Sequence, residues 1–157
     1  MIPDQSAVIA QIHSRQASGE SCVLAGGCYD MCLIHHIRSL RQAATFGDFL
    51  VVALNSDSSV RSLKAKSRPI CDQATRQETL EALRFVDFVV LFDEITAEQV
   101  IRLVRPDVFF KSTAAPPLPC EEVAVADVGA LTALGDVFPG MSTTELIRRI
   151  QATSPEK

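Results

Sequence analysis

The chain has 157 residues, of which 47% are hydrophobic and 22% are charged, so it can form one domain with a real core and is too apolar for a disordered chain. Its formal net charge of −4 and its pI of about 5.3 argue against a nucleic-acid partner. No apolar run reaches the roughly 18 residues that span a bilayer, so we expect no membrane partner. The first residues show no secretory signal, and the five cysteines are an odd count, which predicts free thiols in the cytoplasm.

Apolar stretches alternate along the chain with stretches of helical spacing. Residues 34–46 place Ile37, Leu40 and Ala44 on one helical face, and Gly47 ends that helix. Residues 49–54 are continuously apolar, as in strands that are buried on both faces. Helices are predicted over residues 7–17, 34–46, 72–84, 97–104 and 121–127, and a last helix follows Ser142, with Leu146, Ile147 and Ile150 as its apolar residues. Strands are predicted over residues 22–25, 49–54, 88–92, 108–110 and 130–134. This alternation predicts an α/β fold, a Rossmann-like parallel sheet of about five strands with helices on both faces.

Local signals indicate where these elements begin and how the chain divides. We expect Asp72 to cap the helix over 72–84, and we expect capping boxes from Thr96 with Gln99 and from Ser142 with Glu145. Residues 55–58 read as a turn, 61–69 as a basic polar segment, and 114–119 as a loop because of its prolines. The predicted organisation is a helical appendage over 1–20, one domain over 21–151 and a polar tail over 152–157.

Ligands of parallel sheets bind beyond the carboxyl ends of the strands, where the strand order reverses. In this sequence the rule points to residues 26–30, 55–57, Lys111 and 142–144. Gly26-Gly27 would let a ligand approach the backbone at the start of a helix, where free amides attract anions. A tight turn explains the two glycines about as well, and neither the dinucleotide fingerprint nor a Walker sequence is present.

Histidines and basic residues are the candidate chemical groups of this edge. His35 and His36 stand near the start of a predicted helix, where a histidine can stabilise developing charge or simply pack. A cluster of positive charge would suit a polyphosphate, with a solvated loop as the alternative: Arg61, Lys64, Lys66 and Arg68. A metal role for Cys28, Cys32 and His35 is a weaker idea, because their spacing is not that of a zinc knuckle, and we expect no metal site.

Several segments are similar, in order and in separation, to the motifs of one known family. Gly27-Cys28-Tyr29-Asp30 is similar to G-C-F-D, residues 52–57 to V-A-V-N-S-D, and 61–69 to R-x-L-K followed by S-R-P. Arg76 matches an arginine at the start of the next helix, and residues 105–111 and 142–147 are similar to R-P-D-x-x-x-K and S-T-T-x-x-I. Over about residues 22–151 the chain thus resembles the cytidylyltransferase-like nucleotidyltransferases, most of all the adenylyltransferase domains of bacterial ADP-heptose synthases.

The resemblance implies the transfer of a nucleoside monophosphate to a phosphorylated, sugar-phosphate-like acceptor, with release of pyrophosphate. It also implies Mg²⁺ as the cofactor, ATP as the favoured nucleotide with CTP as the alternative, and a homodimer. The catalytic residues that it implies are His36 and Lys64. The implied nucleotide-binding residues are Gly26, Gly27, Cys28, Tyr29, Lys111, Ser142, Thr143 and Thr144, and the implied acceptor-binding residues are Asp30, Asn55, Asp57 and Arg68.

The sequence departs from the family's motifs where the ligand is expected. The H-x-G-H segment falls on residues 33–36, and only His36 is retained. Leu33 replaces a hydrogen-bond donor, whose loss typically costs about 10²–10³ in rate, and His35 replaces a glycine that lies against the nucleotide. The segment K-G-G-D reads Lys111-Ser112-Thr113-Ala114. The sequence therefore predicts a nucleotidyltransferase with impaired or altered catalysis, and as the alternative a non-catalytic relative that binds a nucleotide, a sugar phosphate or a protein partner.

Overall fold

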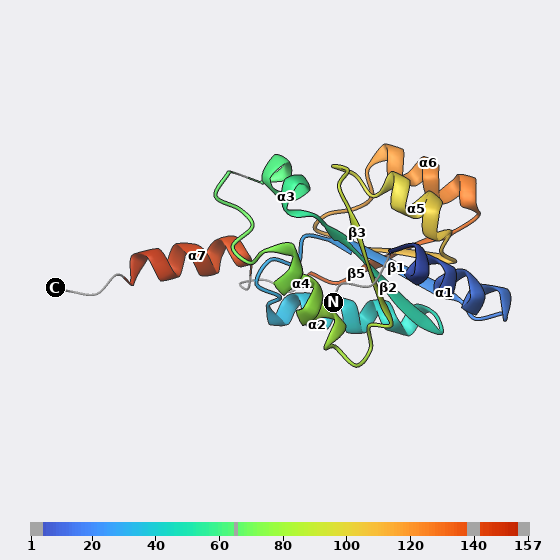
Figure 1. Cartoon of the computed structure of the whole chain (residues 1–157). Coiled ribbons are helices and arrows are strands. Elements are labelled where there is room, and N and C mark those ends of the chain that lie inside the picture. The colour runs from blue at the N-terminus through green and yellow to red at the C-terminus, as the bar shows by residue number, and fades with distance from the viewer. Residues whose placement is uncertain (1–4, 65, 138–141, 154–157) are drawn as a thin grey trace.

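The predicted parallel sheet is present and has five strands. The computed structural model describes residues 5–64, 66–137 and 142–153. Its strands are β1 (Cys22–Gly27), β2 (Phe49–Asn55), β3 (Phe88–Phe92), β4 (Val108–Ser112) and β5 (Leu131–Gly135). They lie in the order β3-β2-β1-β4-β5, and every neighbouring pair is parallel (Figure 1). Because the chain runs from β1 outward to β3 and then crosses back to β4, the order reverses between β1 and β4.

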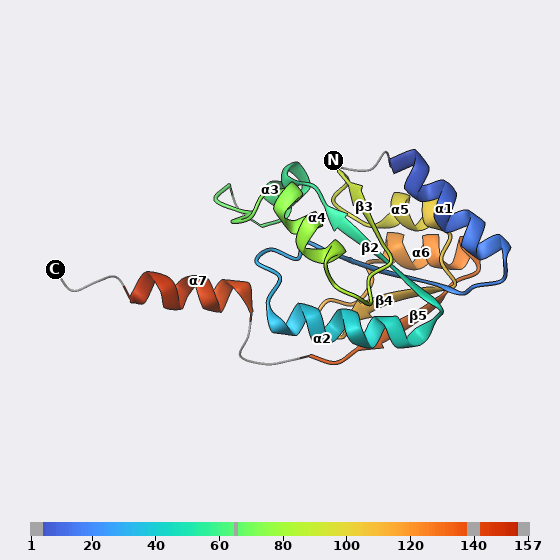
Figure 2. The same cartoon turned by 60° about the horizontal axis from the view of Figure 1, so that its bottom comes forward.

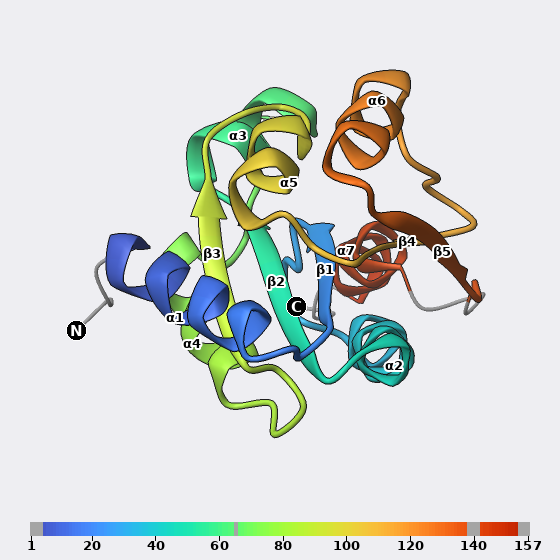
Figure 3. The same cartoon turned by 90° about the vertical axis from the view of Figure 1, so that its right-hand side faces the viewer.

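Helices cover both faces of the sheet, as the continuously apolar strands predict. One face carries α1 (Gln5–Ala17), α5 (Glu98–Val104) and α6 (Pro119–Val128), and the other carries α2 (Ile34–Ala43) and α4 (Gln73–Glu81) (Figures 2 and 3). Every residue of β2 is buried, and successive side chains enter opposite cores, with Val51 in one and Val52 in the other. Among the described helices, none is long and apolar enough to cross a membrane.

The segment predicted as an N-terminal appendage contains a helix that packs on the sheet. Val8 and Ile12 of α1 belong to the hydrophobic core, and Ile12 is fully buried. The guanidinium of Arg15 pairs with Asp87 at 2.7 Å and lies 4.3 Å from the centre of the Phe49 ring. These contacts fix α1 against the strands, while the domain boundaries at residues 20 and 151 stay predictions.

Two expectations about helix starts are wrong. Residues 57–63, expected to continue a turn into a polar segment, form α3 (Asp57–Leu63), because the Ser56 hydroxyl accepts the Ser59 amide and caps the helix. The expected Thr96 capping box is absent, since α5 begins at Glu98 and no side chain of its own segment caps it. Instead the buried carboxylate of Glu121 accepts the Ala97 amide at 2.9 Å.

Other boundaries shift by a few residues. The helix predicted over 34–46 is α2 followed by the short 3₁₀ turn η1 (Ala44–Phe46), and α6 starts at Pro119, at the end of the expected loop. The predicted stop, Gly47, is extended and lies so close to β1 that an added Cβ would be 2.7 Å from a methyl carbon of Val23. Gly47 is therefore required for close packing at the turn into β2.

The last helix, α7 (Thr143–Ala152), begins where the sequence predicts. The Ser142 hydroxyl accepts the Glu145 amide, which is one half of the expected capping box, and the Glu145 carboxylate accepts from Arg148. The helix extends away from the rest of the molecule (Figures 1 and 2). Thr143 is its one buried residue and Ile150 is exposed, so its predicted apolar face is not buried within the described chain. Residues 154–157 of the predicted tail lie outside the described residues.

Candidate active site at the carboxyl edge of the sheet

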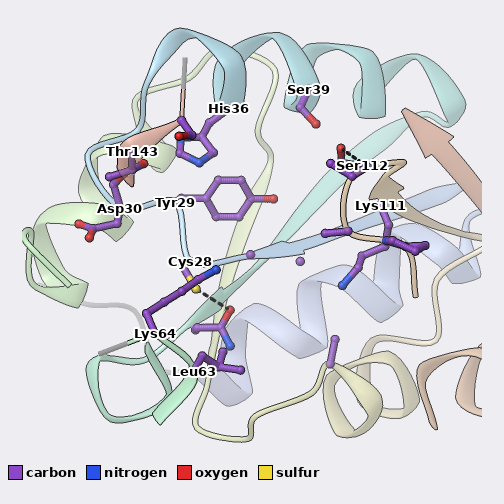
Figure 4. Close-up of a pocket in the computed structure, with 18 of the residues that line it drawn as sticks. Cys28, Tyr29, Asp30, His36, Ser39, Leu63, Lys64, Lys111, Ser112 and Thr143 are labelled. Atoms are coloured by element: carbon purple, nitrogen blue, oxygen red, sulfur yellow. Dashed lines mark hydrogen bonds between the residues drawn. The ribbon is translucent and has the colours of Figure 1, made fainter. Parts of the chain in front are cut away.

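A cavity of about 880 Å³ lies at the carboxyl ends of the strands, where the strand order reverses. The two glycines at the end of β1 line it, and side chains from the loop after β1, from α2, from the end of α3 and from β4 turn toward it (Figure 4). The expected ligand residues that line it are Gly26, Gly27, Cys28, Tyr29, Asp30, His36, Asn55, Lys64, Arg68, Lys111, Ser142, Thr143 and Thr144. The one expected residue that does not line it is Asp57.

The loop from β1 to α2 is strained and folds back over the end of β1. Tyr29, Met31 and Cys32 have φ angles of 47°, 64° and 32°, in the left-handed region that side chains other than glycine rarely adopt. An added Cβ at Gly27 would lie 3.1 Å from the Tyr29 ring, whereas at Gly26 it would make only an ordinary contact. Gly27 thus makes room for the loop's own tyrosine, as a tight turn requires, and it also lines the cavity.

Asp30 fastens this loop to the segment before α4. Its carboxylate accepts the amides of Ile70 and Cys71 and lies 2.6 Å from Nε of Arg68. Burial alone would raise the pKa of Asp30, but these donors outweigh it, and the pKa lies below the ordinary value. The Thr143 hydroxyl donates to the Asp30 carbonyl at 3.1 Å, which joins the start of α7 to the same loop. Asp30 and Arg68, both implied acceptor-binding residues, are therefore bonded to each other.

A buried arginine joins the ends of β1 and β2. Arg76 is 1% exposed, and its guanidinium donates to the carbonyls of Cys28, Asn55 and Cys71 at 2.7, 2.8 and 3.0 Å. Its charge is balanced by Asp57 at 2.8 Å. The carboxylate of Asp57 thus pairs with Arg76, and Asp57 does not line the cavity. Arg76 belongs to the sequence motifs, but the motifs give it no role, because most of its partners lie far from it in the sequence and most are main-chain carbonyls.

The two histidines lie against each other beside the cavity. The Leu33 amide donates to Nδ1 of His36 at 3.1 Å, so a neutral His36 ring carries its proton on Nε2. The pKa of His36 is lowered to about 4, mainly because the ring is buried and further because His35 lies beside it. The negative charge of Asp30 has the opposite effect and raises this pKa, but by less. The ring centroids are 3.9 Å apart, and burial also lowers the pKa of His35. Both rings are therefore neutral at pH 7, and His36 can donate a hydrogen bond without carrying charge.

The two lysines of the cavity reach into it from opposite sides and differ in their counter-ions (Figure 4). Nζ of Lys111 lies 3.3 Å from the carboxylate of Glu121, and these side chains are 17% and 3% exposed. Among the described residues, no ion pair includes Lys64. Burial raises the pKa of the Cys28 thiol, and the positive charge of Lys64 has the smaller, opposite effect of lowering it. The uncompensated positive charge of the cavity thus lies at Lys64.

The carboxylates of the cavity already have protein donors. Asp30 accepts from Arg68, Glu121 pairs with Lys111, and Asp136 accepts the side-chain amide of Gln42 at 3.2 Å. Within the described ranges, no three His, Cys, Asp or Glu side chains are grouped to hold a metal ion. Because Mg²⁺ is normally bound through carboxylates, water and substrate phosphates, these residues do not form a Mg²⁺ site by themselves. The ion that the resemblance implies would come with the phosphates of a nucleotide.

Several residues that form the walls of the cavity belong to no motif of the sequence. Ser39 lies one turn after His35 on α2, which helical spacing would have indicated. Glu121 lies beside Lys111 although the two are ten positions apart in the sequence, and only the tertiary structure shows this contact. The remaining wall residues of this kind are Asp136 and a set of apolar residues that includes Phe92, Ile95, Ala97, Pro117 and Leu118.

Comparison with known proteins identifies the class of this fold and site. A family model described as cytidylyltransferase-like matches residues 24–118, which is more than half of the chain. The chain therefore belongs to the cytidylyltransferase-like family, and the predicted resemblance to these nucleotidyltransferases is confirmed.

Its relatives include much longer proteins that carry the name bifunctional protein HldE. The protein of Geotalea uraniireducens (strain Rf4) is 38% identical over 154 residues, which are 98% of this chain and 31% of the relative. The protein of Hydrogenovibrio crunogenus (strain DSM 25203 / XCL-2) is 42% identical over 149 residues, which are 90% of this chain and 30% of the relative. The chain thus spans about three tenths of the length of these relatives.

Solved structures share the fold. The lipopolysaccharide core biosynthesis protein from Thermoplasma volcanium GSS1 has a TM-score of 0.63 at 24% identity, over 76% of this chain and 98% of that chain. Pantoate-beta-alanine ligase from Francisella tularensis, in complex with beta-gamma ATP and beta-alanine, has a TM-score of 0.57 at 10% identity, over 83% of this chain and 65% of that chain. At these identities the likeness shows the fold alone.

Proposed function

We propose that this chain is a cytoplasmic, homodimeric nucleotidyltransferase that binds ATP, or CTP as the alternative, in the cavity at the carboxyl edge of the sheet. The nucleoside monophosphate would pass to a phosphorylated, sugar-phosphate-like acceptor. A phosphate oxygen of the acceptor would attack the α-phosphorus, the bond from that phosphorus to its bridging oxygen would break, and pyrophosphate would leave. The observation that carries the proposal is the cavity itself. In a family fold it brings together at one edge the neutral His36 and Lys64, whose ammonium belongs to no ion pair of the described residues.

The residues of this chain would act by position and charge. Lys64 would balance the charge of the phosphates, and His36 would donate from Nε2 to a phosphoryl oxygen, since its Nδ1 is occupied by the Leu33 amide. Ser142, Thr143 and Thr144 line the cavity at the start of α7, where free amides suit phosphate oxygens. Mg²⁺, bound by the phosphates, would supply further charge neutralisation.

Catalysis in this chain is proposed to be slow. Leu33 offers no side-chain donor, and the imidazole of His35 lines the cavity at the position where the family has a glycine. The same two residues support the second candidate, a non-catalytic relative that binds a nucleotide. Both candidates predict nucleotide binding, and they differ in turnover.

The test has a binding part and a turnover part. Thermal unfolding is measured with ATP, CTP and sugar phosphates in the presence of Mg²⁺, and a binder raises the Tm by mass action. We expect a larger shift with ATP than with CTP and pyrophosphate release near background. No shift with either nucleotide would overturn the proposal. Robust pyrophosphate release that His36→Ala abolishes would instead show an efficient enzyme and contradict the impaired catalysis.

A further inference from the structure

The side chains of the described residues that line the cavity have no net charge when the histidines are neutral. Three cations and three anions are present there: Lys64, Arg68 and Lys111, and Asp30, Glu121 and Asp136. A nucleoside triphosphate remains an anion even when it carries one Mg²⁺. The proposed ligand would therefore enter a cavity whose described lining has no surplus positive charge to balance it, and an unbalanced charge is costly where water is excluded.

Two histidines at the start of α2 line the same cavity and can take up a proton. The ring centroids of His35 and His36 are 3.9 Å apart. Two positive rings at this distance would repel each other strongly, so the pair accepts one proton rather than two. One proton would give the lining the positive charge that it lacks.

The hydrogen bonds of the two rings favour His35 as the ring that takes the proton. Nδ1 of His36 accepts the Leu33 amide at 3.1 Å, and a proton on this nitrogen would break that bond. Nδ1 of His35 is buried without a hydrogen-bond partner, so charging this ring breaks no existing bond at that nitrogen. Burial lowers the pKa of both rings, to about 4 for His36, and both are neutral at pH 7 without a bound anion.

The titratable and charged groups around the pair come from every element that borders the cavity. In the loop after β1, Asp30 is bonded to Arg68, and its pKa lies below the ordinary value, so it stays negative. The same loop holds three groups that stay protonated because burial raises their pKa values: the thiols of Cys28 and Cys32 and the phenol of Tyr29. The remaining charged groups are Lys64 at the end of α3, Lys111 of β4 with Glu121 of α6, Asp136 after β5, and Arg38, which lies one turn from His35 on α2, is exposed and does not line the cavity.

We infer that His35 is a phosphate-binding residue of this cavity, and that its imidazole takes up one proton from the solvent when the nucleotide binds. The inference rests on the proposed function, because it adds a binding residue to that same site. The proton is added to a ring nitrogen, and no bond of the nucleotide forms or breaks in this step. The same imidazole that crowds the nucleotide thus also contributes charge to its binding.

The inference has a consequence for the pH dependence of binding. The phosphate charge favours the charged ring, so the pKa of His35 is higher in the complex than in the free protein. By linkage, the affinity for the nucleotide rises as the pH falls from above the bound pKa toward the free pKa.

Histidine NMR tests where the proton goes. The chain has three histidines, so single Gln variants assign the ring signals of His13, His35 and His36. Each signal is followed over about pH 5–8, with and without saturating ATP and Mg²⁺. We expect the pKa of His35 to rise by about 1–3 in the complex and His36 to remain neutral. The signal of His13, whose ring bonds the Leu103 carbonyl outside the cavity, should follow one curve in both samples. An unchanged His35 curve in the complex, or a proton on His36 instead, would overturn the inference.

Matched variants test whether the proton contributes to binding. The Kd of ATP with Mg²⁺ is measured by calorimetry at about pH 6 and about pH 8 for His35→Gln and for the control His13→Gln. Both variants lose one imidazole, and the titration of ATP itself is the same in both. From the higher to the lower pH the affinity should rise about tenfold more in the control, since a pKa change of 1 corresponds to a factor of ten. Equal pH dependence in the two variants would also contradict the inference.

Inorganic tripolyphosphate separates this inference from the proposed function, because it has the phosphates without the nucleoside. If tripolyphosphate binds with the expected pH dependence while ATP and CTP do not bind, nucleotidyl transfer is rejected and His35 remains a phosphate-binding residue. If ATP binds with equal pH dependence in both variants, the role of His35 is rejected and the proposed function remains. If neither ATP, CTP nor tripolyphosphate binds, both are rejected.

Discussion

Lys64 is the residue at which one substitution tests the charge distribution of the cavity. Lys64→Ala removes the lining cation that has no ion-pair partner among the described residues. A unit charge at 4 Å from a phosphate charge contributes at most about 4 kcal/mol near a protein surface. Because Lys64 is exposed, solvent screening reduces this to about 1–2 kcal/mol, which weakens nucleotide binding roughly 5- to 30-fold.

The matched control is Lys66→Ala, which removes the same charge from an exposed residue that does not line the cavity. The Kd of ATP with Mg²⁺ is measured by calorimetry at low and at high salt. We expect Lys64→Ala to weaken binding well beyond the control, and we expect the difference to shrink at high salt, where charges are screened. Unchanged affinity in Lys64→Ala, or equal losses in both variants, would refute the reasoning.

Three further predictions concern catalysis, pH and packing. Leu33→His combined with His35→Gly should raise pyrophosphate release from ATP, since a missing donor is worth about 3 kcal/mol of transition-state stabilisation, and an unchanged rate would contradict the view that these positions limit turnover. The folded-state pKa of His36, about 4, lies below its ordinary value of 6.5, so the unfolded chain takes up the proton first as the pH falls. Stability should therefore be full above pH 6.5 and fall between 6.5 and 4, and urea unfolding of His36→Gln should show a smaller loss over that range. Gly47→Ala should lower the free energy of unfolding by about 1–3 kcal/mol because its Cβ would lie 2.7 Å from a neighbouring carbon, whereas Gly26→Ala, with 3.8 Å of room, should change the Tm little.

The sequence by itself determined the class of fold and the edge at which the cavity lies. Strands that are buried on both faces must be continuously apolar, so residues 49–54 and 88–92 were recognisable without any tertiary information. The helix caps of Asp72 and Ser142 were also predictable, because such a cap is made within a few residues of the chain. The family motifs led to most of the residues that line the cavity for the same reason, since each motif is a local run at the end of a strand.

Only the tertiary structure decided which of those residues are free to meet a ligand. Asp30 and Asp57 match the family motifs equally well, yet each carboxylate is bonded to an arginine that is distant in sequence. Glu121 gave no signal in the sequence, although it caps α5, holds the start of α6 and neutralises Lys111. A local pattern records the propensities of neighbouring residues, whereas the charge and polarity of a cavity depend on which distant side chains the fold brings within hydrogen-bond distance.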